Sequence, residues 1–240
     1  MKRIQFLFVS VALLFVAATK AQTVDDIINK HIDAVGGKDK LSQIKSLYVE
    51  NSVEVMGNAT SSVESLVEGK GFKSESDFNG MKIVNCYTDK GGWSLNPFAG
   101  ATDPQAMPEE IYNVGKDQIY FGGNLYFASP LMDYAAKGNK AELQGKEGTN
   151  YKIKFTAGGR ETTYYIDQST YYLTKSVTKG EMMGQSIEIV STYSDHKKTD
   201  FGIVLPNSRT TDFGQFALAA KVTKVEVNKE IDPKIFEMSK

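Results

Sequence analysis

From residue 46 onward, apolar and polar residues alternate with a period of two along most of the chain. In the stretch 46–55, SLYVENSVEV, most apolar side chains fall on odd positions and the charged ones on even positions. Such alternation predicts a β-strand with one buried face and one wet face. Further stretches of this kind, bounded by Gly, Asn or Asp, lie near residues 63–68, 71–78, 81–88, 91–95, 140–147, 150–156, 161–167, 171–179, 185–195, 201–214 and 216–229.

The spacing of these stretches predicts a mainly β (α+β) fold. Short connections join most of them, and no alternation of strands with helices indicates a parallel sheet. We therefore expect about ten to eleven antiparallel strands in a sandwich or barrel. No repeat, low-complexity segment or linker divides the sequence, so residues 22–240 are expected to form a single domain.

Residues 23–45 follow a helical period instead. Thr23 precedes two acidic residues, which suits the start of a helix, and the glycine pair 36–37 is expected to end it. A second short helix is expected around Leu41 and Ile44. The apolar stripe of the first helix consists of Ile27, Ile28, Ile32 and Val35.

Residues 103–138 interrupt the strands with an unusually apolar segment. Pro108, followed by two glutamates, is typical of the first turn of a helix. A long apolar insertion inside a β framework is uncommon unless it forms a lid or covers an open sheet. The pattern therefore predicts a helical lid.

The first 21 residues have the features of a secretory signal peptide. A basic start precedes an apolar run at 4–18 and a small-residue stretch that ends at Ala21. The run is shorter than the roughly 20 residues of a membrane-spanning helix, and an uncleaved anchor is the alternative. We expect cleavage after Ala21, so that 1–21 is the signal peptide and the rest is a soluble exported protein.

Charge and cysteine content exclude several classes of function. The chain has 28 basic and 29 acidic residues, and residues 1–21 carry three of the basic ones and no acid, so the exported part has a net charge of about −4. With only Arg160 and Arg209 left as arginines, no nucleic-acid partner is expected. The single cysteine, Cys86, allows no internal disulfide, and its strand context favours a small buried hydrophobe.

Groups suited to catalysis or metal binding are few. His31 lacks the glutamate that a HExxH zinc motif requires beside it. His196 lies near Asp195 and Asp200. An ordinary surface turn is a simpler interpretation of these residues than a metal site. No nucleophile elbow or phosphate-binding glycine loop occurs, and Asp167 in YYIDQST is expected to cap a turn. We therefore expect no catalytic residue, no metal and no cofactor.

Four stretches, in order along the chain, resemble the LolA-like superfamily of exported lipoprotein carriers, in particular the outer-membrane lipoprotein-sorting proteins of the Bacteroidota. They are IINKHIDAVGGKDKLSQIKSL, YYIDQSTYYLTKS, YSDHKKTDFGIVLPNS and VEVNKEIDPKIFEMS. The resemblance implies an incomplete antiparallel β-barrel around an apolar cavity, with N-terminal helices and a helical lid across its mouth. It also implies a periplasmic location. One departure is plain: the arginine that such carriers have early in the barrel is missing, because no arginine lies between Arg3 and Arg160.

The expected function is that of a non-catalytic carrier, a monomer that binds lipid or an acylated lipoprotein and passes it to a membrane acceptor protein. Burial of acyl chains from water would supply the binding energy. Two alternatives stay open, a periplasmic sensor or protein-binding module of the same fold, and a hydrolase with dispersed catalytic residues. For any single tyrosine, ordinary packing in the core or on the sheet is the alternative to a role in binding. The residues expected to line the cavity or its lid are Trp93, Phe98, Ile111, Tyr120, Phe121, Tyr126, Phe127, Leu131 and Met132.

Overall fold

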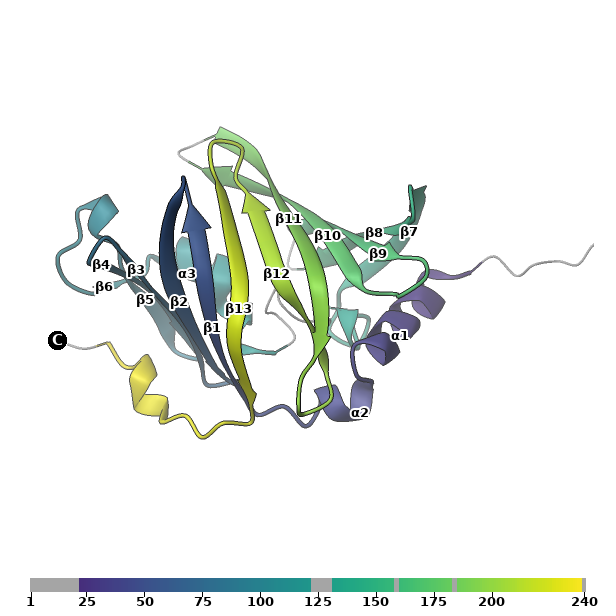
Figure 1. Cartoon of the computed structure of the whole chain (residues 1–240), viewed down its shortest axis with the longest axis horizontal. Helices are drawn as coiled ribbons and strands as arrows, with labels where there is room; N and C mark the ends of the chain where they lie inside the picture. Colours follow the sequence, from purple (N-terminus) through teal and green to yellow (C-terminus); the bar gives the residue numbers. More distant parts are fainter. Residues whose placement is uncertain (1–21, 122–130, 158–159, 183–184, 239–240) are drawn as a thin grey trace, which may run out of the picture.

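All strands of the described chain belong to one antiparallel sheet (Figure 1). The computed structural model describes residues 22–121, 131–157, 160–182 and 185–238. The strands are β1 (Ser46–Val55), β2 (Asn58–Val67), β3 (Gly71–Phe78), β4 (Met81–Thr88), β5 (Gly91–Leu95), β6 (Gln105–Ala106), β7 (Lys140–Glu147), β8 (Asn150–Ala157), β9 (Arg160–Asp167), β10 (Leu173–Met182), β11 (Gln185–Lys198), β12 (Val204–Asp212) and β13 (Ala217–Val227).

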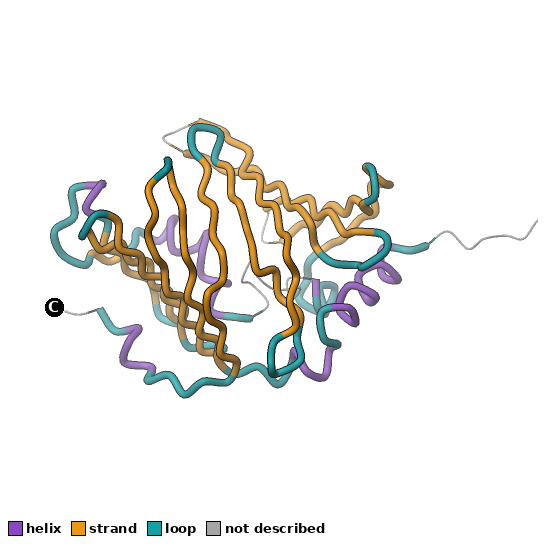
Figure 2. The backbone as a smooth tube through the Cα atoms, in the orientation of Figure 1, coloured by secondary structure: helices purple, strands orange, loops and turns teal. Residues whose placement is uncertain are grey.

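The strand order is β6-β5-β4-β3-β2-β1-β13-β12-β11-β10-β9-β8-β7, so the first and last long strands, β1 and β13, pair at the centre. The two edges, β6 and β7, do not pair with each other, and the sheet curves without closing (Figure 2). The expected fold class, an incomplete antiparallel barrel, is confirmed. The sheet has 13 strands instead of the expected ten or eleven, and β6, at two residues, is too short to show a period.

The two faces of the sheet can be told apart by the residues of β1. Leu47, Val49, Asn51 and Val53 point to one side, which we call the inner face, and all four are buried. Tyr48 and the other even positions point to the outer face. Because side chains alternate along every strand, the pairing register assigns each strand residue to one face or the other.

Helices α1 (Val24–Ala34) and α2 (Lys38–Leu41) cover the inner face. The helical period predicted both helices, although the second ends at Leu41, before Ile44. Thr23 and Asp26 form a reciprocal capping box at the start of α1. At the end, Gly36 adopts φ +138°, and a side chain there would meet the backbone and side chain of Ile203. The apolar cluster of α1, α2 and the sheet includes Ile27, Ile28, Ile32, Val35, Leu41, Ile44, Leu47, Val49, Leu66, Phe72, Tyr151, Ile153, Phe155, Tyr164, Ile166 and Ile203.

The apolar insertion begins with the short strand β6 and continues as a helix, which the sequence predicted. Helix α3 (Glu109–Gly115) starts after Pro108 and continues into a 3-10 turn, η2 (Lys116–Ile119). Another 3-10 turn, η1 (Pro97–Ala99), follows β5. Figure 1 shows α3 on the same side of the sheet as α1.

The chain's C-terminal segment covers part of the outer face. Its 3-10 turn, η4 (Pro233–Phe236), packs on β3 and β4, where the Phe236 ring joins a cluster with Val84, Cys86 and Trp93. The Trp93 indole N–H donates to the Phe236 carbonyl at 2.8 Å, and the Cys86 thiol lies 3.4 Å from the same oxygen. Cys86 is fully buried, as expected, and its burial raises the pKa of the thiol to about 12.

Gly71 permits this docking, because a Cβ there would lie 2.5–2.8 Å from ring atoms of Phe236. We expect Gly71→Ala to lower the free energy of unfolding by about 1–3 kcal/mol, the usual cost of overpacking. Urea denaturation would measure it. The Gly71→Ala change made in a Phe236→Ala background should cost much less, since the clash is gone. Equal costs in both backgrounds would show that the contact does not limit the packing.

Candidate functional site: the inner face of the sheet

The inner face is apolar where α1 and α2 lie and polar farther along the same strands. Asn51 is 2% exposed and interrupts the apolar series of β1. Its amide Nδ2 donates to Ser62 Oγ at 3.2 Å, and its Oδ1 has no protein partner. A buried amide oxygen without a donor is costly in a folded protein, so this position is a candidate for contact with a ligand or water.

Glu64 and Arg209 form an ion pair over this polar region. Glu64 stands opposite Val49, and Arg209 stands opposite Ala220, which is itself opposite Val53, so both side chains belong to the inner face. Arg209 NH2 lies 3.9 Å from Glu64 Oε1, although β1 and β13 separate their two strands in the sheet. The long side chains therefore reach across the inner face.

Hydroxyl pairs continue the polar region toward β9. Their oxygens are 3.0–3.1 Å apart, and the residues belong to neighbouring strands of the same face. The pairs are Ser191 with Thr211, Ser176 with Tyr193, and Thr162 with Thr178. The inner face thus offers an apolar half and a hydrogen-bonding half, an arrangement that matches an amphiphilic ligand.

A few polar contacts fasten α1 to the sheet. The buried His31 Nδ1–H donates to the carbonyl of Tyr171 at 2.6 Å, and Lys30 Nζ donates to the Tyr171 hydroxyl at 3.3 Å. Tyr171 belongs to the β9–β10 turn, where Asp167 accepts backbone hydrogen bonds from Ser169 and Thr170. The turn-capping role predicted for Asp167 is confirmed, and the hydroxyl and backbone donors lower its pKa to about 2.

The insertion is fastened at both ends of residues 122–130, which lie outside the described part. At one end, the Phe121 N–H donates to the Glu68 carboxylate, and Ile119 accepts from the Gly69 N–H at 2.9 Å. Burial raises the pKa of Glu68, while the Phe121 hydrogen bond acts in the opposite direction.

At the other end, two contacts join the segment after residue 130 to the N-terminal helices. The Tyr134 hydroxyl donates to Asp25 at 2.6 Å, and this hydrogen bond, with burial adding to it, raises the tyrosine pKa to about 12. Lys38 pairs with Asp133 at 2.7 Å. The lid and α1 are therefore linked at the protein surface as well as through the core.

The structure separates the residues predicted for the cavity and its lid. Phe121, Leu131 and Met132 pack against the inner-face cluster with α1. Trp93 points to the outer face and holds the C-terminal segment. Ile111 and Tyr120 are about half exposed on the insertion, and Phe98 is exposed beside Phe78. Tyr126 and Phe127 lie outside the described residues.

Sequence reasoning missed Asn51, Glu64 and Arg209. A signal for Asn51 was present, since it occupies an odd position among the apolar residues of the first strand. Glu64 and Arg209 gave none, because each looks like an ordinary charged residue of a half-exposed strand until the pairing places both on one face.

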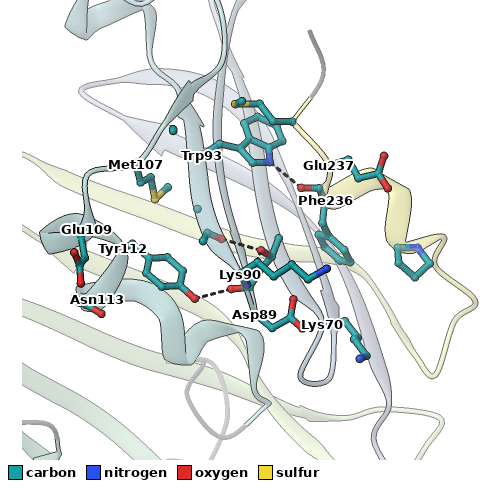
Figure 3. A pocket seen from close by; sticks show the side chains of 16 residues that line it. Lys70, Asp89, Lys90, Trp93, Met107, Glu109, Tyr112, Asn113, Phe236 and Glu237 are labelled. Carbon is teal, nitrogen blue, oxygen red and sulfur yellow. Dashed lines mark hydrogen bonds between the residues drawn. The ribbon is translucent and has the colours of Figure 1, made fainter.

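A groove of about 940 Å³ opens at the β5 side of the sheet (Figure 3). Trp93 and Phe236 line it on one side and Met107 and Tyr112 on the other. The Tyr112 hydroxyl donates to the Thr88 carbonyl at 2.8 Å, which holds α3 against the β4–β5 turn. Charged side chains around the groove are Lys70, Asp89, Lys90, Glu109 and Glu237.

Within the described residues, the side chains offer no site for metal chemistry. No group of three or more His, Cys, Asp and Glu side chains is placed to hold a metal ion in this part of the chain. Likewise, none of the helices that the structure describes is long and apolar enough to cross a membrane.

An open antiparallel sheet with helices across its inner face defines the class of fold, and solved structures share it. A LolA superfamily protein from Nitrosomonas europaea matches with a TM-score of 0.59 and 12% identity over 90% of this chain and 98% of that one. A DUF1329 family protein from Desulfovibrio piger matches with a TM-score of 0.56 and 13% identity over 90% and 98%. A domain assigned to outer membrane lipoprotein sorting, from Vibrio parahaemolyticus, matches with a TM-score of 0.53 and 11% identity over 87% and 95%.

The chain therefore has the fold of LolA superfamily proteins, as the sequence resemblance implied. No family model and no curated protein sequence matches it. At such low identities the likeness concerns the fold alone.

His31 predicts a pH dependence of stability. Burial lowers its pKa from 6.5 to about 4, so the unfolded chain takes up a proton before the folded one does. Stability should therefore fall as the pH drops from 6.5 to about 4, by roughly 3 kcal/mol from this group. Above pH 6.5 the imidazole is neutral in both states and contributes no slope.

Denaturation of His31→Gln between pH 7 and pH 4 would test this, since glutamine can still donate to the Tyr171 carbonyl. The variant should lose less stability on acidification than the wild-type protein. His196→Gln is a comparison variant: burial lowers the pKa of that histidine too, so its removal should change the acid dependence in the same direction. Parallel curves for wild type and His31→Gln would contradict the prediction.

Proposed function

We propose that this protein is an exported, non-catalytic carrier that binds lipid or the acyl chains of lipoproteins against the inner face of its sheet and moves them between membranes. The observation that carries the proposal is how the apolar inner face is covered. Its cover consists of α1, α2 and the ends of the insertion, and none of these belongs to the sheet. Lifting them would expose the apolar surface without breaking a strand pair.

The chemistry of the inner face suits an amphiphile. Each methylene of an acyl chain that leaves water for the apolar half contributes about 0.8 kcal/mol, so binding requires no reactive group. The polar half, with Asn51 and the Glu64–Arg209 pair, would receive the hydrogen-bonding end of the same molecule. Among proteins of similar fold, the domain assigned to outer membrane lipoprotein sorting supports this class of cargo.

Phe121, Leu131 and Met132 are the lid residues of the proposal, because they occupy the inner-face cluster where an acyl chain would lie. Ile111 and Tyr120 would form the outer part of the lid. Trp93 has the structural role described above, and Phe98 is exposed and packs on Phe78 at one end of the sheet. A monomer that works in the periplasm, after removal of residues 1–21, fits this proposal.

Native mass spectrometry of protein exported to a bacterial periplasm would test cargo binding, with organic extraction to name the bound molecule. Wild-type protein should carry a lipid or an acylated peptide. Met132→Asp places a carboxylate against the apolar cluster from a half-buried position and should lower occupancy at least about tenfold. The matched control is Met238→Asp, a methionine of the C-terminal segment that is 48% exposed.

Two outcomes would contradict the proposal. One is wild-type protein that carries nothing and takes up neither fatty acid nor lipopeptide on titration. The other is an equal loss of cargo in both methionine variants, with unchanged circular dichroism. An empty protein would favour the protein-binding alternative, for which the groove beside Trp93 and Tyr112 is the candidate surface.

Tyr134→Phe should loosen the lid, since it removes the hydrogen bond to Asp25 at the surface. Loss of about 1 kcal/mol from the closed state should speed release of a bound fluorescent fatty acid about fivefold. Release into excess vesicles would be followed by stopped flow. The matched control is Tyr48→Phe, whose hydroxyl donates to Glu50 at 2.9 Å on the outer face. Equal release rates in the two variants would show that this contact does not hold the lid.

A further inference from the structure

The β1–β2, β3–β4 and β12–β13 turns and η1 lie along the same end of the sheet (Figure 1), and each carries apolar residues. Met56 is 79% exposed and Phe98 58% exposed. Met81 is also exposed, and the other members are half-buried. We call this group the apolar rim; its members are Met56, Phe78, Met81, Phe98, Phe213 and Phe216.

The pairing register and the ring contacts bring the rim residues into two groups. Val55 stands opposite Leu218, so Met56 lies next to the turn that carries Phe213 and Phe216. Those two rings stack with centroids 4.9 Å apart. Two strands farther along the sheet, Phe78 is paired with Met81, and the Phe78 ring packs edge-on against Phe98 with centroids 5.8 Å apart.

The opposite end of the sheet has a different character. Antiparallel strands place alternate turns at opposite ends, and the exposed residues in the turns of that end are polar. They include Glu68, Lys70, Asp89, Lys90, Thr149 and Asp200. Exposed Met and Phe in hairpin turns are therefore confined to the rim end of the described sheet.

The backbone at the rim already has hydrogen-bond partners within the protein. Asp77 accepts from the Gly80 N–H at 2.8 Å, and Asp212 accepts from the Gly214 N–H at 2.7 Å. The Phe213 N–H donates to the Phe216 carbonyl at 3.0 Å, and the Phe98 N–H donates to Asn96 at 3.1 Å. Backbone groups that are satisfied internally can leave water at lower cost, a requirement for contact with lipid.

The charges beside the rim argue for a particular kind of partner. Glu54, Asp77 and Asp212 are exposed there, with Lys82 as the adjacent cation. This balance does not attract an anionic surface. Two of the carboxylates are also engaged in holding their own turns, which leaves them poorly available to a basic protein.

We propose that the apolar rim docks the protein on a lipid bilayer, inserting its separate turns into the interfacial region of zwitterionic lipid. Several short apolar turns around a polar body suit shallow insertion better than a complementary protein groove, which needs a contiguous patch. The inference rests on the exposed residues of the rim and goes beyond the proposed binding of cargo.

Flotation with vesicles of phosphatidylcholine would test the rim, using the whole exported chain. Wild-type protein should bind them, with little change on addition of salt or of phosphatidylglycerol. Met56→Asp/Phe98→Asp should lower partitioning at least about tenfold. The matched control is Leu143→Asp/Met238→Asp, which introduces the same charges at exposed apolar positions on β7 and the C-terminal segment.

Several results would overturn the proposal. These are no binding of wild-type protein to phosphatidylcholine, equal losses in both double variants, or binding that requires phosphatidylglycerol and disappears in high salt. A rim that instead joins two copies of the chain would appear as a dimer in size-exclusion chromatography, abolished by Met56→Asp/Phe98→Asp.

The same variants separate the two proposals. Rim variants should lose vesicle binding and keep their cargo mass, whereas Met132→Asp should lose cargo and keep vesicle binding. Loss of both properties in a single variant with altered circular dichroism would indicate misfolding, and Phe98→Ser would then replace Phe98→Asp as the milder change at the same position.

Discussion

An open sheet of 13 strands has to bury an apolar face that it cannot close by pairing its own edges, and the rest of the structure depends on this constraint. In a closed barrel, strands cover strands. Here the cover is made of helices and loop segments that pack on the sheet mainly through side chains, with a few backbone contacts such as the Val204 N–H donating to the Val35 carbonyl at 2.9 Å. Apolar contact drives the packing, but it does not determine the position of a helix along the sheet, because hydrophobic burial is non-directional. The hydrogen bonds of His31, Phe121 and Tyr134 are directional and fix the position of the cover on the sheet.

The two faces of the sheet are covered in different ways. On the outer face, Trp93 donates to the backbone of the C-terminal segment, and the Phe236 ring fills the space left by Gly71. That contact is close and specific, with no room for another group. The inner cover is held mainly by apolar packing of buried residues such as Ile27, Ile28 and Ile32, together with the hydrogen bond of the buried His31. Its surface contacts, such as the Lys38–Asp133 ion pair, contribute little by themselves. Opening the inner cover therefore exposes apolar surface, at a cost that rises with the area exposed.

The sequence was enough to predict most strands and helices, but not which face of the sheet each side chain joins. Strong alternation in 46–55 and the capping residues before 24–34 specify a strand and a helix locally, so both could be predicted. The side to which Trp93 points depends on which face the C-terminal segment covers, a choice made by contacts between residues 143 positions apart. The Glu64–Arg209 pair likewise requires the register of β1 with β13. Of the residues that pack on the inner face, sequence reasoning named Phe121, Leu131 and Met132, which are marked by their apolar character alone.

The polar half of the inner face is the least expected feature of a surface suited to acyl chains. A buried ion pair recovers little more than the cost of removing its charges from water, so Glu64 and Arg209 add little to stability by themselves. Apolar residues of similar size in place of Glu64 and Arg209 would bury Asn51 without the cost of removing charges from water. The resemblance implied an arginine early in the barrel, and this chain has none there; Arg209 of β12 reaches the carboxylate of Glu64 on β2 instead. The fold thus places the Glu64–Arg209 ion pair at a defined position beside apolar surface. In the proposed function, such an arrangement would distinguish a ligand with one polar end from a plain hydrocarbon, because only the former would pair with groups that the sheet has already removed from water.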